Sequence, residues 1–406
     1  MTVHRVAVTG LGAICALGHS VPEMWAALCE GRSAIAPMQS LDVSQLRFQN
    51  AAEVSQYDPG AHFSPEQAAF LDRFAQFALI AARQALRDSG IQLTDALREN
   101  TAVICGSCIG GQSTQDIGFV DLYTLQKGRV HPLTIPRTMA NAGASQISME
   151  LGTTGPAFTI STACSSANHA IGQAFRMVRS GEVELAIAGG SEAPLSFGLL
   201  KAWEAMRVIA PDTCRPFSAD RRGTILGEGG AMLILEPLAA ARARGARIYA
   251  EIVGLGMSSD AHHITQPSVA GPARAMRAAL RDAEMRPEQI GYINAHGTAT
   301  PSNDATETRA IHEVFGAQAR KLAVSSTKSM HGHALGAAGA LEAVATVLAL
   351  REGILPPTAN FTTPDPQCDL DVIPNAARHA RVECALSNSF AFGGLNAVLA
   401  FRAISS

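Results

Sequence analysis

Apolar and polar positions alternate in blocks along the whole chain. Short apolar runs of the kind that forms buried strands are separated by longer segments in which apolar residues recur at helical spacing. The predicted strands are residues 5–9, 101–105, 184–188, 248–256, 290–295 and 323–326, with a strand pair over 230–236. The predicted helices are residues 21–29, 72–89, 273–283, one from Cys164 to about residue 180, and one from residue 326 to about residue 351. This alternation predicts an α/β protein with buried sheets.

The order of these elements repeats within the chain. The segment ALRDSG at residues 85–90 precedes one predicted strand, and ALRDAE at residues 279–284 precedes another. A later strand leads into a helix through STAC at residues 161–164 and, in matching order, through SSTK at residues 325–328. Because four elements recur in order, we interpret the chain as a duplication whose corresponding loops meet in one composite site. The two predicted halves are residues 1–250 and 251–406.

Composition and charge argue against several classes of protein. The 406 residues include 35 acidic and 32 basic side chains, and this near balance gives no electrostatic footprint for nucleic acid. The chain opens on a strand-like run instead of a secretory signal, and no apolar stretch is long enough to span a bilayer. Eight cysteines without the spacing of a disulfide framework predict reduced thiols and a cytoplasmic protein.

Cys164 lies where an apolar strand-like run ends and a helix rich in small residues is predicted to begin. A helix start presents unpaired backbone N–H groups and the positive end of the helix dipole, which favour the thiolate over the thiol. We therefore interpret Cys164 as a candidate nucleophile. Taken alone, a buried cysteine is more often inert packing.

Three other segments have the character of a catalytic site. His296 follows a predicted strand within NAHGTATP, and His333 lies within KSMHGHALG at the start of a small-residue helix. A histidine at the end of a strand is a common catalytic base, although a single one is usually a structural residue. The glycine-rich turn at residues 388–396 offers backbone N–H groups that can bind an oxyanion. One thiol and two histidines at the ends of elements favour catalysis.

Two further motifs suggest metal or redox chemistry and are interpreted as neither. His331 and His333 invite a zinc site, but no second pair of ligands accompanies them. Cys105 and Cys108 have redox-motif spacing, but the segment ends a strand and enters glycines instead of starting a helix.

Two glycine-rich segments are also interpreted as structural. The segment VTGLG at residues 8–12 begins like a dinucleotide fingerprint, but Cys15 stands where the third glycine belongs, so we expect a turn after the first strand. The segment at residues 227–230 lacks the lysine and hydroxyl of a phosphate loop and is expected to form a close-packed hairpin.

Together these segments resemble the β-ketoacyl-acyl carrier protein synthases, specifically the elongating type II enzyme and its relatives. The matching segments are residues 8–12, 161–165, 215–217, 294–301, 325–339 and 388–396. The resemblance implies a duplicated thiolase-like α/β fold with five αβαβα layers, assembled as a dimer. It implies no redox cofactor.

The resemblance also implies a reaction and its catalytic residues. Cys164 matches the nucleophile, His296 and His333 match the two histidines of a Cys-His-His site, and Lys328 and Glu342 match supporting charged residues. Cys164 is then expected to take an acyl chain from a carrier protein. Malonyl-acyl carrier protein loses carbon dioxide, and its enolate attacks the acyl group to give a β-ketoacyl chain two carbons longer.

Further positions match residues that bind substrate in the family. The backbone N–H groups of Cys164 and Phe392 match an oxyanion hole, and Thr298 and Thr300 match contacts to the phosphopantetheine arm. Ile109 and Phe392 match a gate over the acyl tunnel.

Some relatives hold a monovalent cation near positions that match Asn388 and Glu342. The resemblance admits such a structural ion here, and hydrogen bonds could satisfy the same groups equally well.

The chain departs from the family pattern at several positions. His331 stands where threonine is common, Ala299 replaces a serine, and Cys108 replaces a glycine beside the gate, where it is expected to narrow or redirect the tunnel. Residues 64–74 lack the basic side chains that relatives offer to an acidic carrier protein, since only Arg73 is basic there. This favours a dedicated carrier protein from a specialised pathway.

Two alternatives come from the same superfamily. A noncatalytic subunit that sets chain length in a heterodimer usually lacks the nucleophile, whereas Cys164, His296 and His333 are all present here. A thiolase requires a second catalytic cysteine near the C-terminal glycine turn, where this chain has Phe392. We therefore expect a homodimeric enzyme, with a heterodimer as the alternative.

Overall fold

The computed structural model describes residues 3–404 and is built on one ten-stranded mixed sheet. The strand order is β10-β9-β13-β14-β8-β1-β7-β6-β4-β5. The strands of the first half are β1 (Val6–Cys15), β4 (Thr101–Gly106), β5 (Ala157–Ile160), β6 (Leu185–Glu192) and β7 (Gly229–Pro237). Those of the second are β8 (Ala250–Ser259), β9 (Ile290–Asn294), β10 (Ala323–Ser325), β13 (Cys384–Ala391) and β14 (Leu395–Arg402).

The topology confirms the duplicated fold. The first half is ordered β5-β4-β6-β7-β1, and the second half, β10-β9-β13-β14-β8, follows the same order strand for strand. The halves meet at a short seam, where Val6, Ala7 and Val8 of β1 pair with Ile252, Glu251 and Ala250 of β8. The boundary near residue 250 stays a prediction.

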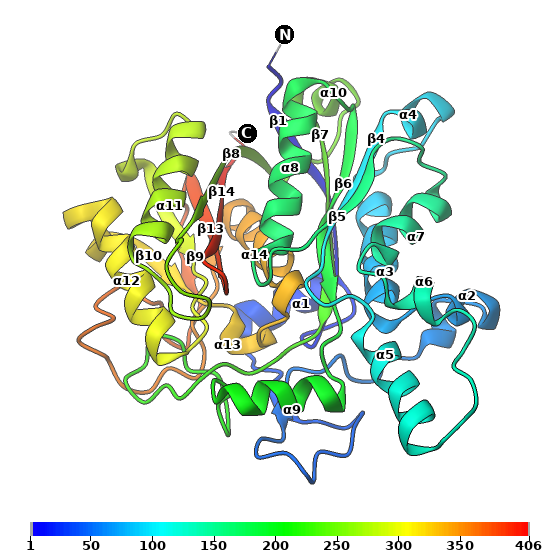
Figure 1. The fold of residues 1–406 in the computed structure, drawn as a ribbon. Coiled ribbons are helices and arrows are strands. Elements are labelled where there is room, and N and C mark those ends of the chain that lie inside the picture. Colours follow the sequence, from blue (N-terminus) through cyan, green and yellow to red (C-terminus); the bar gives the residue numbers. More distant parts are fainter. Residues whose placement is uncertain (1–2, 405–406) are drawn as a thin grey trace.

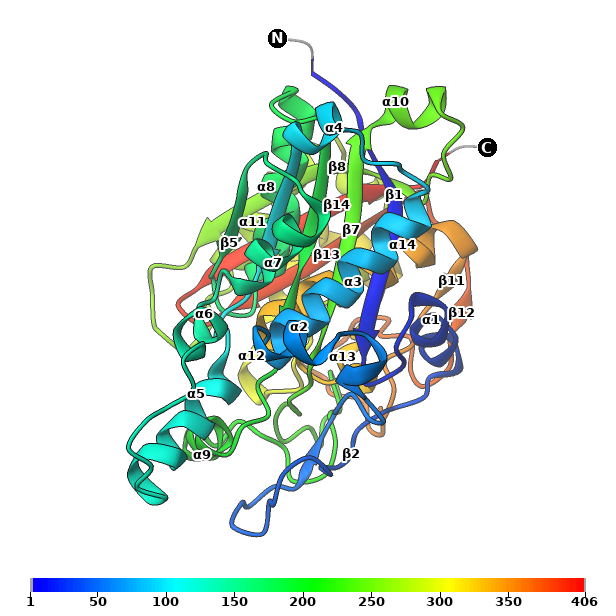
Figure 2. The ribbon, with the colours of Figure 1, turned by 90° about the vertical axis from the view of Figure 1, so that its right-hand side faces the viewer.

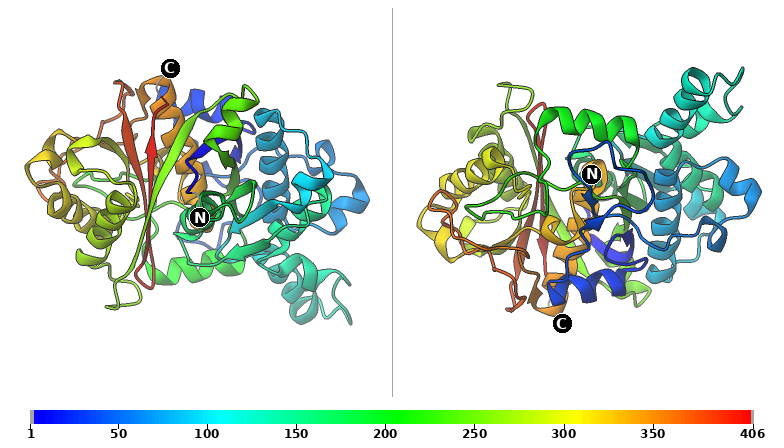
Figure 3. Two further views of the ribbon diagram at one scale, coloured as in Figure 1. Left: turned by 90° about the horizontal axis from the view of Figure 1, so that it is seen from above. Right: turned by 90° about the horizontal axis from the view of Figure 1, so that it is seen from below.

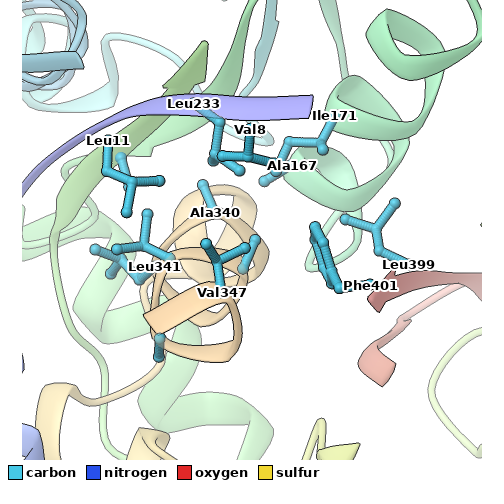
Figure 4. Close-up of a cluster of buried hydrophobic side chains, with 14 of the residues drawn as sticks. Val8, Leu11, Ala167, Ile171, Leu233, Ala340, Leu341, Val347, Leu399 and Phe401 are labelled. Atoms are coloured by element: carbon cyan, nitrogen blue, oxygen red, sulfur yellow. The ribbon is translucent and has the colours of Figure 1, made fainter. Parts of the chain in front are cut away.

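The two halves of the sheet form two layers, and helices form the other three (Figures 1 and 3). They are α8 (Ser166–Ser180) and α14 (Ala338–Glu352) in the centre, α3 (Arg73–Ser89) and α7 (Ala142–Leu151) outside the first half-sheet, and α11 (Ala270–Asp282) and α12 (Pro301–Phe315) outside the second. The central helix α14 is buried from Ala338 to Leu350, as expected of a helix that is apolar on every side. Its side chains Ala340, Leu341 and Val347 lie among those of β1, β7, α8 and β14 (Figure 4). The molecule is therefore a five-layered αβαβα protein.

The glycines at residues 8–12 lie inside β1, so the predicted turn there is wrong. They are needed for close contact with α3: a Cβ on Gly12 would lie 1.9 Å from the carbonyl oxygen of Ala81. The second half repeats this contact, since a Cβ on Gly256 of β8 would lie 1.9 Å from the carbonyl oxygen of Ala275 on α11. The resemblance to a dinucleotide fingerprint reflects strand–helix packing.

Two other predictions of secondary structure are corrected. The strand pair over residues 230–236, with a hairpin at 227–230, is one strand, β7, which pairs antiparallel with both β1 and β6. The helix predicted from residue 326 to 351 is broken into α13 (Lys328–His331), a 3₁₀ turn (Leu335–Ala337) and α14. The break begins at Gly332, which has a φ of 66° and no room for a side chain beside Ala52. His333 lies in this break.

The smaller elements lie at the periphery of the fold. They are α1 (Val21–Glu30), α2 (Pro65–Ala69), α4 (Asp95–Glu99), α5 (Gln112–Phe119), a π-helical turn (Val120–Thr124), α6 (Thr134–Thr138), α9 (Phe197–Met206), α10 (Leu238–Ala243), 3₁₀ turns at Pro59–Ala61, Pro287–Gln289 and Gly316–Lys321, and the strand pairs β2 (Ala36–Pro37) with β3 (Asn50–Ala51) and β11 (Ile354–Leu355) with β12 (Arg378–His379). The segment from α5 to α6 projects from the first half as an arm (Figures 2 and 3). Among the described residues, no helix combines the length and apolar character needed to cross a membrane.

Candidate active site

Cys164 lies in a tight turn between β5 and α8, and 7% of its surface is exposed. The residue before it, Ala163, adopts a left-handed conformation with a φ of 50°. The hydroxyl of Ser166 fixes the turn, because it accepts the backbone N–H of Thr162 at 2.9 Å and donates to the carbonyl of Ala163 at 2.6 Å. A strained residue between strand and helix presents the following side chain to a site, as in other nucleophile turns.

The two predicted histidines reach the same pocket from the second half. His296 follows β9, His333 lies in the break before α14, and both line a pocket with Cys164. Their ring centroids are 5.6 Å apart and their planes meet at 86°. The structure thus brings together three side chains that are far apart in sequence.

Glu307 of α12 fixes the backbone at His296. Its carboxylate accepts the N–H of His296 at 2.9 Å, the N–H of Gly297 at 2.8 Å and the side-chain amide of Asn388 at 3.1 Å. Glu307 was not predicted from the sequence, because a single carboxylate in an amphipathic helix gives no signal of its own.

Lys328 and Glu342 form a fully buried ion pair beside the histidines. The ammonium group of Lys328 also donates to the carbonyl of His296 at 2.7 Å. Lys328 therefore holds His296 through its backbone. Burial raises the pKa of Glu342 to about 7, against the opposing effect of Lys328.

Both imidazoles are held in the neutral form. Burial, reinforced by the positive charge of Lys328, holds the pKa of His296 and of His333 well below the ordinary value. A neutral imidazole donates from one ring nitrogen and accepts at the other. The pair can therefore offer two uncharged N–H donors to a developing oxyanion.

Burial raises the pKa of the Cys164 thiol to about 11. The charge of Lys328 and the backbone N–H groups of Phe392 and Cys164 act in the opposite direction without reversing this. The expectation that the helix start makes Cys164 a thiolate is therefore wrong, because desolvation outweighs the local dipole. The same two N–H groups that match an oxyanion hole do both act on the Cys164 sulfur.

Phe392 lies in the hairpin turn between β13 and β14. Gly393 and Gly394 follow it in the turn, with left-handed φ angles of 82° and 70°. Its ring stacks on Trp203 of α9, with centroids 6.1 Å apart. Trp203 also lines the pocket and was missed by the sequence analysis, because it has the pattern of an ordinary helix residue. The backbone of Gly393 donates to the carbonyl of Ile264 at 2.7 Å, which ties the turn to the next loop.

That loop, residues 260–267, forms one wall of the pocket and was also missed. Asp260 accepts the side-chain amide of Asn396 at 2.7 Å, and its N–H donates to Gly394 at 2.9 Å. His263 faces the pocket, and its Nδ1 accepts two backbone N–H groups of its own loop. The only signal in the sequence is a polar run after a strand, which is typical of any loop.

Thr298 and Thr300 line the pocket side by side, with hydroxyl oxygens 3.0 Å apart. Thr300 also caps α12 by accepting the N–H of Asn303 at 3.3 Å. Between them Ala299 has a φ of 62°, stabilised by a hydrogen bond from its N–H to Asp304 at 3.1 Å. This side of the pocket is polar and uncharged.

Cys108 and Ile109 do not line the pocket of Cys164. They pack in a neighbouring apolar cluster with Leu335 and Trp203, and Trp203 is shared with the pocket. The other buried members of the cluster are Met38, Leu46, Phe48, Ala51, Leu200 and Leu226. The cluster therefore begins where the pocket ends, behind the Trp203–Phe392 stack.

Comparison with known families identifies the chain. Residues 3–241 match the beta-ketoacyl synthase N-terminal domain, and residues 249–362 match the beta-ketoacyl synthase C-terminal domain. This chain belongs to the β-ketoacyl synthase family.

Relatives match this β-ketoacyl synthase over almost its whole length. Nodulation protein E of a Rhizobium species is 48% identical over 402 residues, covering 98% of this chain and 99% of the relative. The 3-oxoacyl-(acyl-carrier-protein) synthase 2 of Synechocystis is 43% identical over 406 residues, covering 98% of each. A solved structure, the ishigamide ketosynthase/chain length factor, superposes with a TM-score of 0.94 at 38% identity and covers 100% of both chains.

Residues beside Glu342 fit the structural cation that some β-ketoacyl synthases hold. Five side-chain oxygens on the central side of the sheet are buried without a hydrogen-bond partner; they belong to Asn168, Asn294, Glu342, Ser387 and Ser389. The side chain of Asn388 lies on the opposite face of β13, where its amide donates to Glu307. The strand register places Asn294 beside Ser387, and a Cβ on Gly339 would touch both Asn168 and Ser389. Hard oxygen donors of mostly neutral charge suit an alkali-metal cation.

The segment expected to lack a carrier-binding surface has no free cation in this synthase. Arg73, its one basic residue, makes a two-pronged ion pair with the buried Glu228 at 2.6 and 2.8 Å. Phe70, by contrast, is 49% exposed on the same segment. Any contact that residues 64–74 make with a carrier protein is therefore apolar or polar.

Proposed function

We propose that this β-ketoacyl synthase condenses an acyl chain held on Cys164 with a malonyl group carried by acyl carrier protein. The observation that carries this proposal is the meeting of Cys164, His296 and His333 in one pocket. The thiol supplies a nucleophile, and the two neutral imidazoles supply hydrogen-bond donors for an enolate. The 3-oxoacyl-(acyl-carrier-protein) synthase at 43% identity supports the same assignment.

The first step transfers the acyl chain to Cys164. The sulfur attacks the thioester carbonyl of the acyl carrier protein, and the N–H groups of Cys164 and Phe392 stabilise the oxyanion that forms. The bond between the acyl carbon and the pantetheine sulfur then breaks. Because the Cys164 thiol starts neutral, its proton passes to the departing pantetheine sulfur, and the neutral imidazoles can relay it.

The second step breaks the bond between the malonyl methylene and its carboxylate. Carbon dioxide leaves, and the electron pair moves onto the thioester oxygen, where His296 and His333 each donate an N–H. The enolate carbon then bonds to the acyl carbonyl carbon, Cys164 leaves as the thiolate, and solvent returns its proton. Burial, reinforced by the charge of Lys328, lowers the pKa of both imidazoles and keeps them neutral, so that they remain donors and acceptors.

Two different linings receive the two parts of the substrate, the pantetheine arm and the acyl chain. Thr298 and Thr300 offer uncharged hydroxyls to the amides of the pantetheine arm. Cys108 and Ile109 belong to the apolar cluster that would hold the acyl chain, at about 0.8 kcal/mol for each buried methylene. Cys108 narrows this region, since its side chain is packed against its neighbours.

Reconstitution tests the proposed function. The enzyme is incubated with acyl carrier proteins of different chain lengths, and the intact mass and the peptide containing Cys164 are measured. Addition of malonyl carrier protein must then release a β-ketoacyl product two carbons longer. Absence of an acyl adduct with every carrier would overturn the proposal. A dedicated carrier is expected to react faster than a general fatty-acid carrier, and equal rates would contradict that expectation.

We also propose that the enzyme is a homodimer formed through the arm and β5. β5 is the edge strand of the sheet and is only partly covered, whereas β4 beside it is buried throughout. The arm exposes a group of large apolar side chains: Ile117, Phe119, Val120, Tyr123, Leu125 and Ile135. So much exposed apolar surface indicates a protein interface. A heterodimer with a related chain is the alternative, as in the solved ketosynthase of Xenorhabdus doucetiae in complex with its chain length factor.

The expected mass in solution is twice the 42.4 kDa of one chain. Because Ile135 is 70% exposed, Ile135→Asp is expected to leave the fold intact and to weaken the dimer. Light scattering coupled to size-exclusion chromatography measures the mass of the wild type and of the variant. The matched control is Ile264→Asp, which changes an equally exposed isoleucine (69%) on the opposite half. A monomeric wild type that pairs only with a second, homologous chain would favour the heterodimer.

We propose a bound monovalent cation with a structural role, held by the side-chain oxygens of Asn168, Asn294 and Glu342 with Ser387 and Ser389. When bound, it supplies positive charge that stabilises the partner-free oxygens. The melting temperature is therefore expected to be higher in potassium or sodium chloride than in choline chloride at equal ionic strength. Ser387→Ala should reduce the difference, and a difference that survives this change in full would contradict the site. We further place the enzyme in the cytoplasm, which its eight free thiols support.

A further inference from the structure

Glu192, the last residue of β6, is a fully buried carboxylate whose hydrogen-bond partners are all uncharged. One oxygen accepts the hydroxyl of Ser107 at 2.8 Å and the N–H of Ile109 at 3.4 Å. The other accepts the N–H of Cys108 at 2.8 Å and the N–H of Gly336 at 3.0 Å. The successive N–H groups of this turn surround the carboxylate as an anion-binding concavity. A buried charge held only by neutral donors is costly, so its position calls for a functional reason.

The four donors come from two loops that border the reaction. Ser107, Cys108 and Ile109 follow β4 and enter the apolar cluster behind Trp203. Gly336 lies in the 3₁₀ turn that begins two residues after His333. Glu192 is therefore the one side chain among these contacts that connects the wall of the acyl region to the loop that carries His333.

The contact between the two loops depends on close approach to this carboxylate. A Cβ on Gly336 would lie 2.5 Å from the Glu192 carboxylate and 2.6 Å from the N–H nitrogen of Cys108. Leu335, just before it, has a left-handed φ of 45° and packs into the same apolar cluster. The loop after His333 thus accepts backbone strain where it reaches Glu192.

The geometry suits an anion at this position, because both oxygens accept hydrogen bonds. Glutamine has one accepting oxygen; if that oxygen takes the N–H groups of Cys108 and Gly336, its NH₂ group faces the hydroxyl of Ser107, which can accept, and the N–H of Ile109, which cannot. Leaving a donor unpaired in a buried site is penalised, so the neutral amide would loosen Ile109 and with it the Ser107–Ile109 wall. Burial raises the pKa of Glu192 above its ordinary value, and the hydrogen bonds from Cys108, Ser107 and Ile109 oppose this rise without reversing it.

We propose that Glu192 is a positioning residue of the condensing enzyme, which fixes the Ser107–Ile109 wall of the acyl region relative to the loop of His333. The effect of Glu192 on the reaction rests on the proposed function, whereas its positioning role follows from its own hydrogen bonds. Glu192 does not touch the reacting atoms. It sets the distance between the site that selects the acyl chain and one of the two groups that stabilise the enolate.

The negative charge of Glu192 also gives a signal that a purely structural side chain would not give. His296 and His333 line the pocket with Cys164, and the charges of Lys328, Cys108 and Glu192 act on it from outside the pocket. The charge of Glu192 raises the pKa of the Cys164 thiol. In the wild type, alkylation of Cys164 by iodoacetamide should rise with pH up to about 11. Because Glu192 is the smallest of the effects on this pKa, Glu192→Gln is expected to shift the profile slightly to lower pH and to speed alkylation at pH 8 by about twofold.

The second measurement is the acyl-chain profile of acylation at Cys164. Glu192→Gln is expected to reduce the difference in kcat/KM between preferred and non-preferred chain lengths by about tenfold, since the wall is no longer fixed. Ser107→Ala removes one of the four donors, so it should change the profile in the same direction by less. The matched control is Glu236→Gln, another buried carboxylate of the sheet, whose partners Thr9 and Arg244 lie away from the site. It should leave both readouts unchanged.

The outcomes separate this inference from the proposed function. If the wild type takes no acyl group from any carrier, the proposed function fails, and the alkylation profile, which needs no carrier, still tests the effect of Glu192. If Glu192→Gln keeps both the alkylation profile and the chain-length profile of the wild type, the inference is overturned. If Glu192→Gln does not fold, Ser107→Ala decides: a changed chain-length profile supports the inference, and an unchanged one overturns it.

Discussion

Cys164→Ala should abolish the acyl-enzyme completely. The thiol is the nucleophile that forms the thioester, and alanine offers no atom that can replace it. The change removes one sulfur from a turn already fixed by Ser166, so the fold and the binding of the carrier should persist. Intact-mass analysis after incubation with acyl carrier protein should show the adduct in the wild type and none in the variant.

Cys105→Ala is the matched control for this experiment. Cys105 is also buried, lies on the neighbouring strand β4, and has its pKa raised to about 12 by burial, so it should not be acylated. The control should retain the full adduct. An acyl adduct that persists in Cys164→Ala would show that another residue carries the chain.

His333→Ala should slow malonyl decarboxylation by about a hundredfold or more, because one of the two N–H donors to the enolate oxygen is lost. Acylation of Cys164 should continue, since its oxyanion is stabilised by backbone N–H groups. Release of carbon dioxide from malonyl carrier protein and the yield of acyl-enzyme measure the two steps separately.

His331→Ala provides the comparison. His331 is equally buried, lies two residues away, and bonds Thr327 at 3.0 Å instead of lining the pocket. Decarboxylation should remain within a few-fold of the wild type. If both variants lost the activity equally, disruption of the loop would explain the result better than loss of a donor.

The sequence was sufficient to predict the layers and the three central residues. Apolar periodicity located most of the strands because most are buried on both faces, but β13 and β14 were not predicted. The repeated order of elements predicted the duplication that the topology confirms. Cys164, His296 and His333 each follow the end of a strand or helix, and the duplicated order places such ends together. Their catalytic roles stay predictions that the variants above test.

Other properties depend on contacts that no local pattern contains. Trp203 and Glu192 became visible only when α9 and β6 were placed beside loops distant in sequence. The direction of the pKa shift of Cys164 was predicted wrongly. The helix start is a local feature, whereas desolvation depends on everything packed around the sulfur. The break at Gly332 was missed although glycine and its two flanking histidines are poor helix formers, because the constraint that fixes the break comes from the distant Ala52.

The seam between β1 and β8 has only three residue pairs, which bears on how the two halves could be exchanged by recombination. The half that precedes it contains Cys164 together with Cys108, Ile109 and Trp203, and the half that follows contains both histidines and the threonines of the pocket. The apolar cluster also takes Leu335 from the second half, and Trp203 stacks on Phe392. The proposed acyl region is thus encoded in both stretches of the gene, so recombination at the seam would alter it whichever half were exchanged.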